Sequence, residues 1–153
     1  MVLGNNEKNS IVEIVEKFVK DKQKNIQVEN IDEQKEFLDF GTITYTEKTR
    51  AVIKVQDGCN NFCSYCLIPY ARGRIRSRKS ESILKEIKAI AKKEIKEVVI
   101  TGIHVASYGK DLNNNYYLID LLEDINKIDG IERIRLRFSR TKYNNRRFCK
   151  KTF

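Results

Sequence analysis

The chain has 153 residues, of which 41% are hydrophobic and 33% charged, and its formal net charge is +9. This length suits one domain, and no apolar stretch is long enough to cross a bilayer, which excludes a protein with membrane-spanning helices. No secretory signal pattern follows Met1, and four cysteines in a lysine-rich chain favour metal ligation in a reducing compartment over a disulfide framework. We therefore expect a cytoplasmic protein.

The excess positive charge is concentrated in two segments. Residues 1–58 hold 9 basic and 11 acidic side chains, whereas residues 59–80 hold 5 basic and no acidic ones. Residues 137–153 hold 7 basic side chains and again no acidic one. The charge therefore does not indicate a generally basic surface, and only the first of the two segments coincides with a recognisable motif.

The first predicted element is an amphipathic helix over about residues 7–22, followed by a linker. The apolar residues that recur at helical spacing are Ile11, Ile14, Val15, Phe18 and Val19. Residues 23–49 mix charged residues with scattered apolar ones, which predicts short extended pieces rather than a packed element.

A strand and a helix are predicted next. Residues 50–56 alternate in hydrophobicity, which is typical of a strand with one buried face. The two predicted faces are Ala51, Ile53 and Val55 on the apolar side and Val52, Lys54 and Gln56 on the other. Ser80 is expected to cap the following helix, which runs to about Lys93 with Glu81 at its positive end.

Three further elements complete an alternating order. The nearly continuous apolar run at residues 97–101 predicts a second strand that is buried on both faces. Residues 118–125 predict another helix, and residues 131–136 a third strand. An order of strand, helix, strand, helix, strand requires right-handed crossovers and a parallel sheet, so we predict an α/β fold.

Three cysteines with the spacing C-x-x-x-C-x-x-C follow the first strand directly, at Cys59, Cys63 and Cys66. Three thiols this close favour one metal centre, because three sulfurs cannot all pair as disulfides. No second cysteine or histidine pair completes a tetrahedral zinc site. A 4Fe-4S cluster on three cysteines leaves one iron open for a substrate or cofactor. A zinc knuckle or a set of free thiols is the alternative, and Cys149 is assigned no role.

The cysteine loop and its flanks resemble the radical S-adenosylmethionine superfamily, and within it the methylthiotransferases that modify tRNA. The resemblance is carried by three blocks at residues 55–60, 69–78 and 101–111, with an aromatic residue, Tyr65, before the third cysteine. The blocks are most similar to the branch that acts on threonylcarbamoyladenosine. The resemblance implies an open, partial (β/α) barrel, of which this chain holds an incomplete copy.

The resemblance also divides the chain into three parts. Residues 1–49 are interpreted as the remnant of an N-terminal methylthiotransferase domain with its linker, and residues 50–136 as a truncated radical S-adenosylmethionine core. Residues 137–153 form a basic, irregular tail that we interpret as a frame-shifted product. Strands left unpaired by the truncation, such as residues 132–136, predict marginal stability or aggregation.

In function, the resemblance implies that Cys59, Cys63 and Cys66 hold a 4Fe-4S cluster whose open iron binds S-adenosylmethionine. One electron then cleaves this cofactor, and the resulting radical removes hydrogen from C2 of threonylcarbamoyladenosine at tRNA position 37, where a methylthio group is added. The implied partners are tRNA and a one-electron donor such as flavodoxin or ferredoxin. The alternatives are a sibling methylthiotransferase for another modified adenosine or a ribosomal protein, and a non-catalytic iron–sulfur-binding remnant.

Three further residues are candidates for cofactor contacts. In the superfamily, the residue at Tyr65 lies beside the adenine of S-adenosylmethionine, and a turn at Thr101 and Gly102 lies near its amino group. Simple packing of the tyrosine and a tight turn that needs glycine explain these residues equally well. His104 is the only histidine, and we predict a hydrogen-bonding role for it rather than a catalytic one.

Four arginines alternate with other residues at Arg72, Arg74, Arg76 and Arg78. In an extended segment all four guanidinium groups would project from one face, where they could contact tRNA phosphates. Ion pairing with the following helix or with the cofactor carboxylate is the alternative use.

Overall fold

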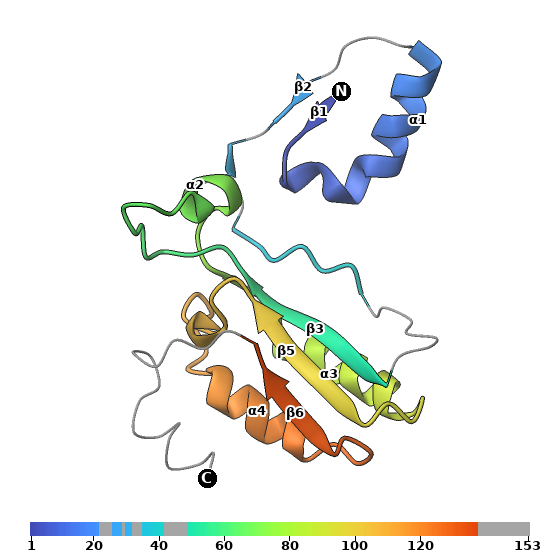
Figure 1. The fold of residues 1–153 in the computed structure, drawn as a ribbon, viewed down its shortest axis with the longest axis vertical. Coiled ribbons are helices and arrows are strands. Elements are labelled where there is room, and N and C mark those ends of the chain that lie inside the picture. The colour runs from blue at the N-terminus through green and yellow to red at the C-terminus, as the bar shows by residue number, and fades with distance from the viewer. Residues whose placement is uncertain (22–25, 29, 32–34, 42–48, 138–153) are drawn as a thin grey trace.

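The computed structural model describes residues 1–21, 26–28, 30–31, 35–41 and 49–137. It shows a small N-terminal unit beside a four-stranded sheet with two helices (Figure 1). The elements of the N-terminal unit are β1 (Val2–Leu3), the 3-10 helix η1 (Asn6–Ser10), α1 (Ile11–Asp21) and β2 (Ile26–Gln27). The remaining elements are β3 (Arg50–Asp57), α2 (Ile68–Arg72), β4 (Arg76–Ser77), α3 (Ser80–Ala91), β5 (Glu97–Gly102), the 3-10 helix η3 (Val105–Ser107), α4 (Leu118–Asn126) and β6 (Arg133–Leu136).

The larger sheet has the strand order β4-β3-β5-β6. β3, β5 and β6 are parallel, which confirms the α/β fold with a parallel sheet. The short β4 pairs with β3 in the antiparallel direction and was not predicted. It forms because the chain returns from the cysteine loop alongside the end of β3.

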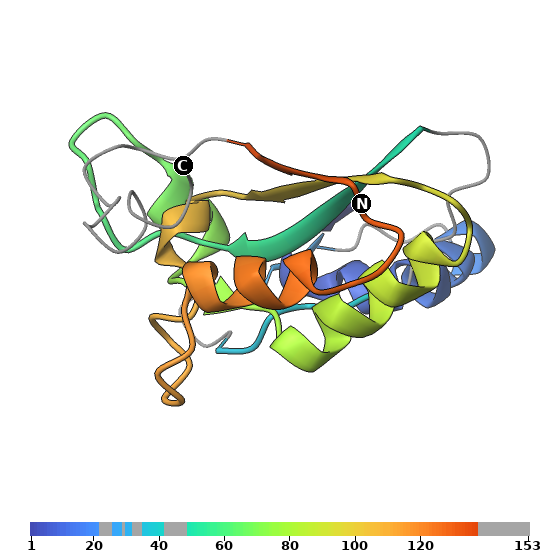
Figure 2. The same ribbon diagram turned by 90° about the horizontal axis from the view of Figure 1, so that it is seen from below.

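Helices α3 and α4 cover the same face of this sheet (Figure 2). The core between them and the strands is built from side chains that alternate along β3 and β5 and from one stripe of each helix. Its fully buried members include Ala51, Ile53, Val55, Ile83, Ile87, Val98, Ile100, Leu121 and Ile125. The strands and helices of this part of the chain therefore match the hydrophobic pattern of the sequence.

Two local predictions are wrong. Ser80 is the first residue of α3 rather than its cap, and the cap position belongs to Lys79, which makes no capping hydrogen bond through its side chain. Gln56 was expected on the polar face of β3 but is fully buried. The reason is an irregularity in the pairing of β3 with β5 between Lys54 and Gln56.

The N-terminal unit contains the predicted amphipathic helix as η1 and α1. No residue of α1 is buried, and Val12 and Val19 are each 65% exposed. The unit contacts the larger part of the chain where the side-chain amide of Asn5 donates to the carbonyl oxygen of Ala71 at 2.6 Å. The predicted basic tail lies outside the described residues from position 138 on. None of the helices in the described part of the chain has the length and apolarity to span a membrane.

Candidate functional site

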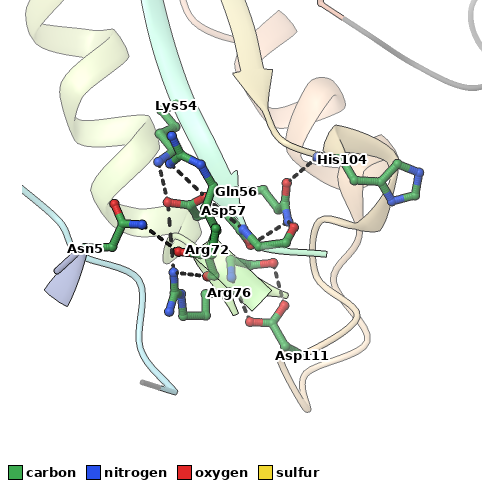
Figure 3. Close-up of polar contacts among 11 residues, drawn as sticks. Asn5, Lys54, Gln56, Asp57, Arg72, Arg76, His104 and Asp111 are labelled. Carbon is green, nitrogen blue, oxygen red and sulfur yellow. Dashed lines mark hydrogen bonds and ion pairs between the residues drawn. The ribbon is translucent and has the colours of Figure 1, made fainter. Parts of the chain in front are cut away.

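The candidate site lies at the edge of the sheet where β3 and β5 end. Because parallel strands end at the same edge, the loops that follow these two strands meet there (Figure 1). The three sequence blocks that predicted a function are joined at this edge by hydrogen bonds (Figure 3). The backbone N–H of His104 donates to Gln56 at 2.8 Å and links the first block to the third. The backbone N–H of Ser77 donates to Asp111 at 2.7 Å and links the second block to the third.

The backbone that enters the cysteine loop is tightly fixed. Gly58 has φ +70°, and a Cβ at this position would lie 1.8 Å from the carbonyl oxygen of Arg74. The next residue, Cys59, donates its backbone N–H to the carbonyl oxygen of Gly73 at 3.1 Å. Glycine alone combines this backbone conformation with such a close approach without strain, so a larger residue here would displace the entry to the loop.

The three cysteines predicted as ligands differ in exposure. Cys59 is buried, Cys63 and Cys66 are half-buried, and none of the three is in a disulfide. The N–H of Cys66 donates to the carbonyl oxygen of Cys63 at 2.9 Å, so these two lie in one turn. Within the described ranges, no three or more His, Cys, Asp or Glu side chains are gathered as metal ligands. Three free thiols are the donor set that iron–sulfur clusters use, although the sulfurs are not gathered at one point.

Aromatic contacts connect the outer part of the cysteine loop to the segment that returns from it. The guanidinium of Arg74 lies 4.4 Å from the ring centre of Phe62, and the rings of Phe62 and Tyr70 meet edge to face at 5.5 Å. The N–H of Ile75 donates to the side chain of Asn60 at 2.9 Å. The loop is therefore closed by its own side chains as well as by its backbone.

The expectation that four arginines project from one face of an extended segment is wrong. Arg72 ends the helix α2 and Arg76 begins the strand β4, so the segment between them is not uniformly extended. Arg74 is exposed and Arg72 is half-buried. These two remain accessible to a ligand in the solvent, whereas the next two arginines do not.

Arg76 and Arg78 are buried, at 4% and 5% exposure. The guanidinium of Arg78 forms ion pairs with Asp39 of the linker, at 2.8 Å, and with Glu86 of α3. The predicted alternative of ion pairing with the following helix is therefore confirmed for Arg78. Its partner Asp39 in addition accepts a hydrogen bond from Ser82, so this arginine, which directly follows β4, joins the linker to α3.

A carboxylate that was not predicted, Asp57, lies at the end of β3 among several cations. Lys54 approaches it at 2.6 Å, Arg72 at 3.6 Å and Arg76 at 4.0 Å. Burial works to raise the pKa of Asp57, but the hydrogen bond and charge of Lys54, with the charge of Arg72, outweigh it and hold this pKa below its usual value. Asp57 is therefore a charged carboxylate that holds Arg72 and Arg76 at the end of β3 by ion pairs.

The three candidate cofactor residues, Tyr65, Thr101 and Gly102, lie near this edge of the sheet. The contacts described for them do not assign them a role. Tyr65 is 83% exposed at the outer end of the cysteine loop. Thr101 and Gly102 end β5 and are half-buried. A Cβ at Gly102 would lie 2.9 Å from the side-chain oxygen of Gln56, so the predicted need for glycine in a tight turn has a physical basis in a close approach.

His104 is buried, and its predicted hydrogen-bonding role is confirmed. Its ring Nδ1 pairs with the hydroxyl of Ser107, and its backbone N–H donates to the side chain of Gln56. Sequence reasoning missed Gln56, because strand alternation placed it on the polar face. Its position in the first sequence block, three residues before Cys59, was the signal that could have identified it.

The loop after β5 is held against β4 by polar contacts. Asp111 accepts from both the hydroxyl and the N–H of Ser77, at 2.5 and 2.7 Å, and the hydroxyl also accepts from the N–H of Gly109 at 2.9 Å. The phenol of Tyr108 donates to the carbonyl oxygen of Arg78 at 2.9 Å. Burial raises the pKa of Tyr108 above its ordinary value, which keeps the phenol protonated as a donor.

Comparison with known proteins supplies a family match. Residues 53–151 match the model of the Radical SAM superfamily. The chain is 43% identical over 136 residues to the threonylcarbamoyladenosine tRNA methylthiotransferase MtaB of Aquifex aeolicus, which covers 89% of this chain and 33% of that protein. It is 34% identical over 137 residues to MtaB of Bacillus subtilis, with 89% and 30% covered.

A second kind of tRNA-modifying protein matches at a comparable level. The chain is 43% identical over 122 residues to the tRNA-2-methylthio-N(6)-dimethylallyladenosine synthase of Clostridium beijerinckii, which covers 79% of this chain and 27% of that protein. The chain thus spans about a third of the length of the curated relatives it matches.

Proposed function

Because this chain belongs to the radical SAM superfamily, and its relatives are tRNA methylthiotransferases that use 4Fe-4S clusters and S-adenosylmethionine, we propose that it carries the cluster-binding part of such an enzyme. The observation that carries the proposal is the meeting of the three sequence blocks at the carboxyl edge of a parallel sheet, where the loop with three free thiols begins. This edge is where sites form in open α/β folds.

In this proposal Cys59, Cys63 and Cys66 hold the cluster. Such a cluster, when bound, supplies the electron that breaks a sulfonium carbon–sulfur bond of S-adenosylmethionine. The buried position of Cys59 and its hydrogen-bonded backbone fix one ligand, whereas the half-buried Cys63 and Cys66 leave the other two accessible from solvent. Tyr65, together with the turn at the end of β5, is assigned to contacts with the cofactor.

The proposed substrate is an adenosine at tRNA position 37 that already carries a modification. Threonylcarbamoyladenosine, methylthiolated at C2, is the first candidate, since two relatives named for this nucleoside align over 89% of the chain. A dimethylallyladenosine is the second candidate, because a relative named for that nucleoside is also 43% identical. A one-electron donor such as flavodoxin or ferredoxin completes the proposed reaction.

Contacts with the tRNA backbone are assigned to Arg72 and Arg74 rather than to all four arginines. These two side chains are accessible, and Arg74 lies on the ring of the partly exposed Phe62. An arginine beside an exposed aromatic ring suits both a phosphate and an unstacked base. The buried Arg76 and Arg78 are assigned to structural ion pairs.

Anaerobic reconstitution with iron and sulfide tests the proposal. The purified chain should take up a 4Fe-4S cluster with an EPR signal, after reduction, that changes when S-adenosylmethionine is added. Cys63→Ser should lose the cluster, and Cys149→Ser, a cysteine outside the motif, should retain it. Uptake of zinc alone, or an EPR signal indifferent to S-adenosylmethionine, would overturn the proposal.

Mass spectrometry of tRNA nucleosides then separates the candidate substrates. The chain would be supplied to cells that lack either methylthiolated nucleoside. Restoration of the methylthio form of threonylcarbamoyladenosine or of the dimethylallyl nucleoside identifies the substrate. A cluster that responds to S-adenosylmethionine without either product would assign the chain to the non-catalytic, cluster-binding alternative.

A further inference from the structure

We propose that Gln56 is a positioning residue that fixes the backbone entering Cys59 against the loop that follows β5. The three-cysteine spacing that defines the candidate site does not include this residue. The proposal concerns the arrangement of the cysteine loop itself, and its importance for a cluster rests on the proposed function.

An extra residue in β3 turns Gln56 into the interior. The pairing of β3 with β5 passes from Lys54 opposite Thr101 to Gln56 opposite Gly102, so two steps along β3 match one step along β5. Val55 and Gln56 are consequently both fully buried, although they are neighbours in a strand. Irregularities of this kind re-aim a side chain and are common beside functional sites.

The carboxamide of Gln56 joins three backbone groups, two at the end of β3 and directly after it and one in the loop after β5 (Figure 3). Its NH₂ group donates to the carbonyl oxygens of Asp57 at 2.6 Å and Gly58 at 2.7 Å, and its oxygen accepts from the N–H of His104 at 2.8 Å. The Gly58 carbonyl belongs to the peptide unit that leads into Cys59. A neutral side chain with two donors and an acceptor is required here, and glutamine has the length to reach all three groups.

Gly102 provides the space that this arrangement needs. A Cβ at Gly102 would lie 2.9 Å from the side-chain oxygen of Gln56 and 2.8 Å from its backbone oxygen. Both distances are shorter than a carbon atom tolerates. The end of β5 is therefore shaped to admit the carboxamide, which is independent support for a fixed position of this side chain.

The link continues beyond His104 into the rest of the loop. The N–H of Ser107 donates to the carbonyl oxygen of His104 at 2.8 Å, and the Ser107 hydroxyl pairs with the His104 ring. A displacement of the Gln56 carboxamide would thus move both the start of the cysteine loop and the turn η3.

Two variants separate the donor and acceptor roles of the carboxamide. Gln56→Glu keeps an acceptor for the N–H of His104 but loses both donors to the cysteine loop. Gln56→Met has a similar length and loses all three hydrogen bonds. Val98→Ala serves as a control for general destabilisation, because Val98 is buried near the opposite end of β5.

The measurement is site-resolved alkylation of the cluster-free chain, with hydrogen exchange read by NMR. In both variants we expect Cys59 to be alkylated about tenfold faster, because a buried group that loses its hydrogen-bond partner shifts such an opening equilibrium by roughly this factor. The exchange protection of the His104 amide should survive in Gln56→Glu and be lost in Gln56→Met. In the control Val98→Ala, the alkylation rate of Cys59 and the exchange rate of the His104 amide should rise only as far as the loss of global stability explains.

Two outcomes overturn the inference. One is that Cys59 in both Gln56 variants is alkylated no faster than in Val98→Ala, once the rates are corrected for differences in global stability. The other is a His104 amide that exchanges alike in Gln56→Glu and Gln56→Met. Neither readout needs a cluster, so failure of reconstitution in the unaltered chain would count against the proposed function and leave this inference to be decided by alkylation and exchange.

Discussion

Asp111 accepts two hydrogen bonds from one residue, Ser77, through its hydroxyl at 2.5 Å and its backbone N–H at 2.7 Å. This contact fastens the loop after β5 to the strand that returns from the cysteine loop. Asp111→Asn keeps the shape but removes the charge, and we expect a loss of about 1–2 kcal/mol in the free energy of unfolding. Urea titration measures it, and the amide of Ser77 should exchange faster. Asp129→Asn, in an exposed turn, should change neither.

Gly58 and Gly41 offer a matched pair for testing the entry to the cysteine loop. Both have positive φ, at +70° and +74°, but a Cβ at Gly41 would meet nothing within 4 Å. Gly41→Ala should therefore cost about 1–2 kcal/mol for the left-handed backbone alone. Gly58→Ala should cost clearly more, because its Cβ would overlap the carbonyl oxygen of Arg74. Equal losses in thermal unfolding would show that the close approach has no energetic weight.

The ion pair of Arg78 and Glu86 is buried, and Arg78 is also paired with Asp39. We expect Arg78→Met to destabilise the chain strongly, by about 3–5 kcal/mol, because a buried carboxylate loses its arginine. Glu86→Gln should cost less, because Arg78 keeps its ion pair with Asp39. Arg135→Met, which breaks a half-exposed pair with Glu97, should cost much less than Arg78→Met, because solvent screens this pair. A double variant of Arg78 and Glu86 that loses less than the sum of the single variants would confirm the coupling; strict additivity would contradict it.

The ion pair of Asp39 with Arg78 should make the free energy of unfolding depend on pH in the acid range. Burial works to raise its pKa, but hydrogen bonds from Arg78 and Ser82 outweigh this and lower the pKa below its ordinary value of 3.8. Because the lowered value belongs to the folded state, the stabilisation is fully present above pH 3.8 and is lost as the pH falls through the folded-state pKa. The difference in unfolding free energy between the unaltered chain and Asp39→Asn should therefore shrink below pH 3.8.

The pH experiment on Asp39→Asn has a matched control in another exposed acid, Asp21. Asp21→Asn, at the exposed end of α1, should leave the acid dependence as it is. A difference between the unaltered chain and Asp39→Asn that stays constant through the acid range would mean that the pairing with Arg78 does not control stability there.

Arg74 and Arg76 should behave differently in RNA binding. Arg74→Ala is expected to lower the slope of log affinity against log salt by about one, as the loss of one phosphate contact does. Its loss of stability should be small, because Arg74 is exposed and its contact with Phe62 lies at the surface. Arg76→Ala should instead destabilise the chain, since its guanidinium is buried beside Asp57. Filter binding with unmodified tRNA measures the slope, with Lys93→Ala as a surface control. Equal slopes for Arg74→Ala and Lys93→Ala would rule out the assigned contact.

The regular elements could be predicted because periodicity and burial agree in them. The alternating residues of β3 and the stripe of α3 place Ile53, Ile83 and Ile87 in one core, as the pattern indicates. The buried Val98 and Ile100 likewise identify β5. In these elements burial of apolar side chains determines the structure, and the spacing of those side chains can be read directly from the sequence.

The parts that could not be predicted depend on contacts between residues far apart in sequence. Alternation alone gives no sign of the extra residue before Gln56, because strand pairing rather than propensity decides the register. By spacing alone the four arginines are equivalent. Two of them, Arg76 and Arg78, are buried and form ion pairs with acids from other elements, Asp57 of β3 and Glu86 of α3. Motif resemblance pointed to the candidate site, whereas the contacts of each side chain within it could be read only from the fold.

The long-range contacts at the site also bear on the order of events during synthesis. The contact of Gln56 with His104 spans 48 residues, and that of Ser77 with Asp111 spans 34. A ribosome therefore releases Cys59, Cys63 and Cys66 well before the segments that fasten their loop exist. At about 5–20 residues per second, the three thiols are therefore synthesised roughly 2–10 seconds before their loop can be fastened.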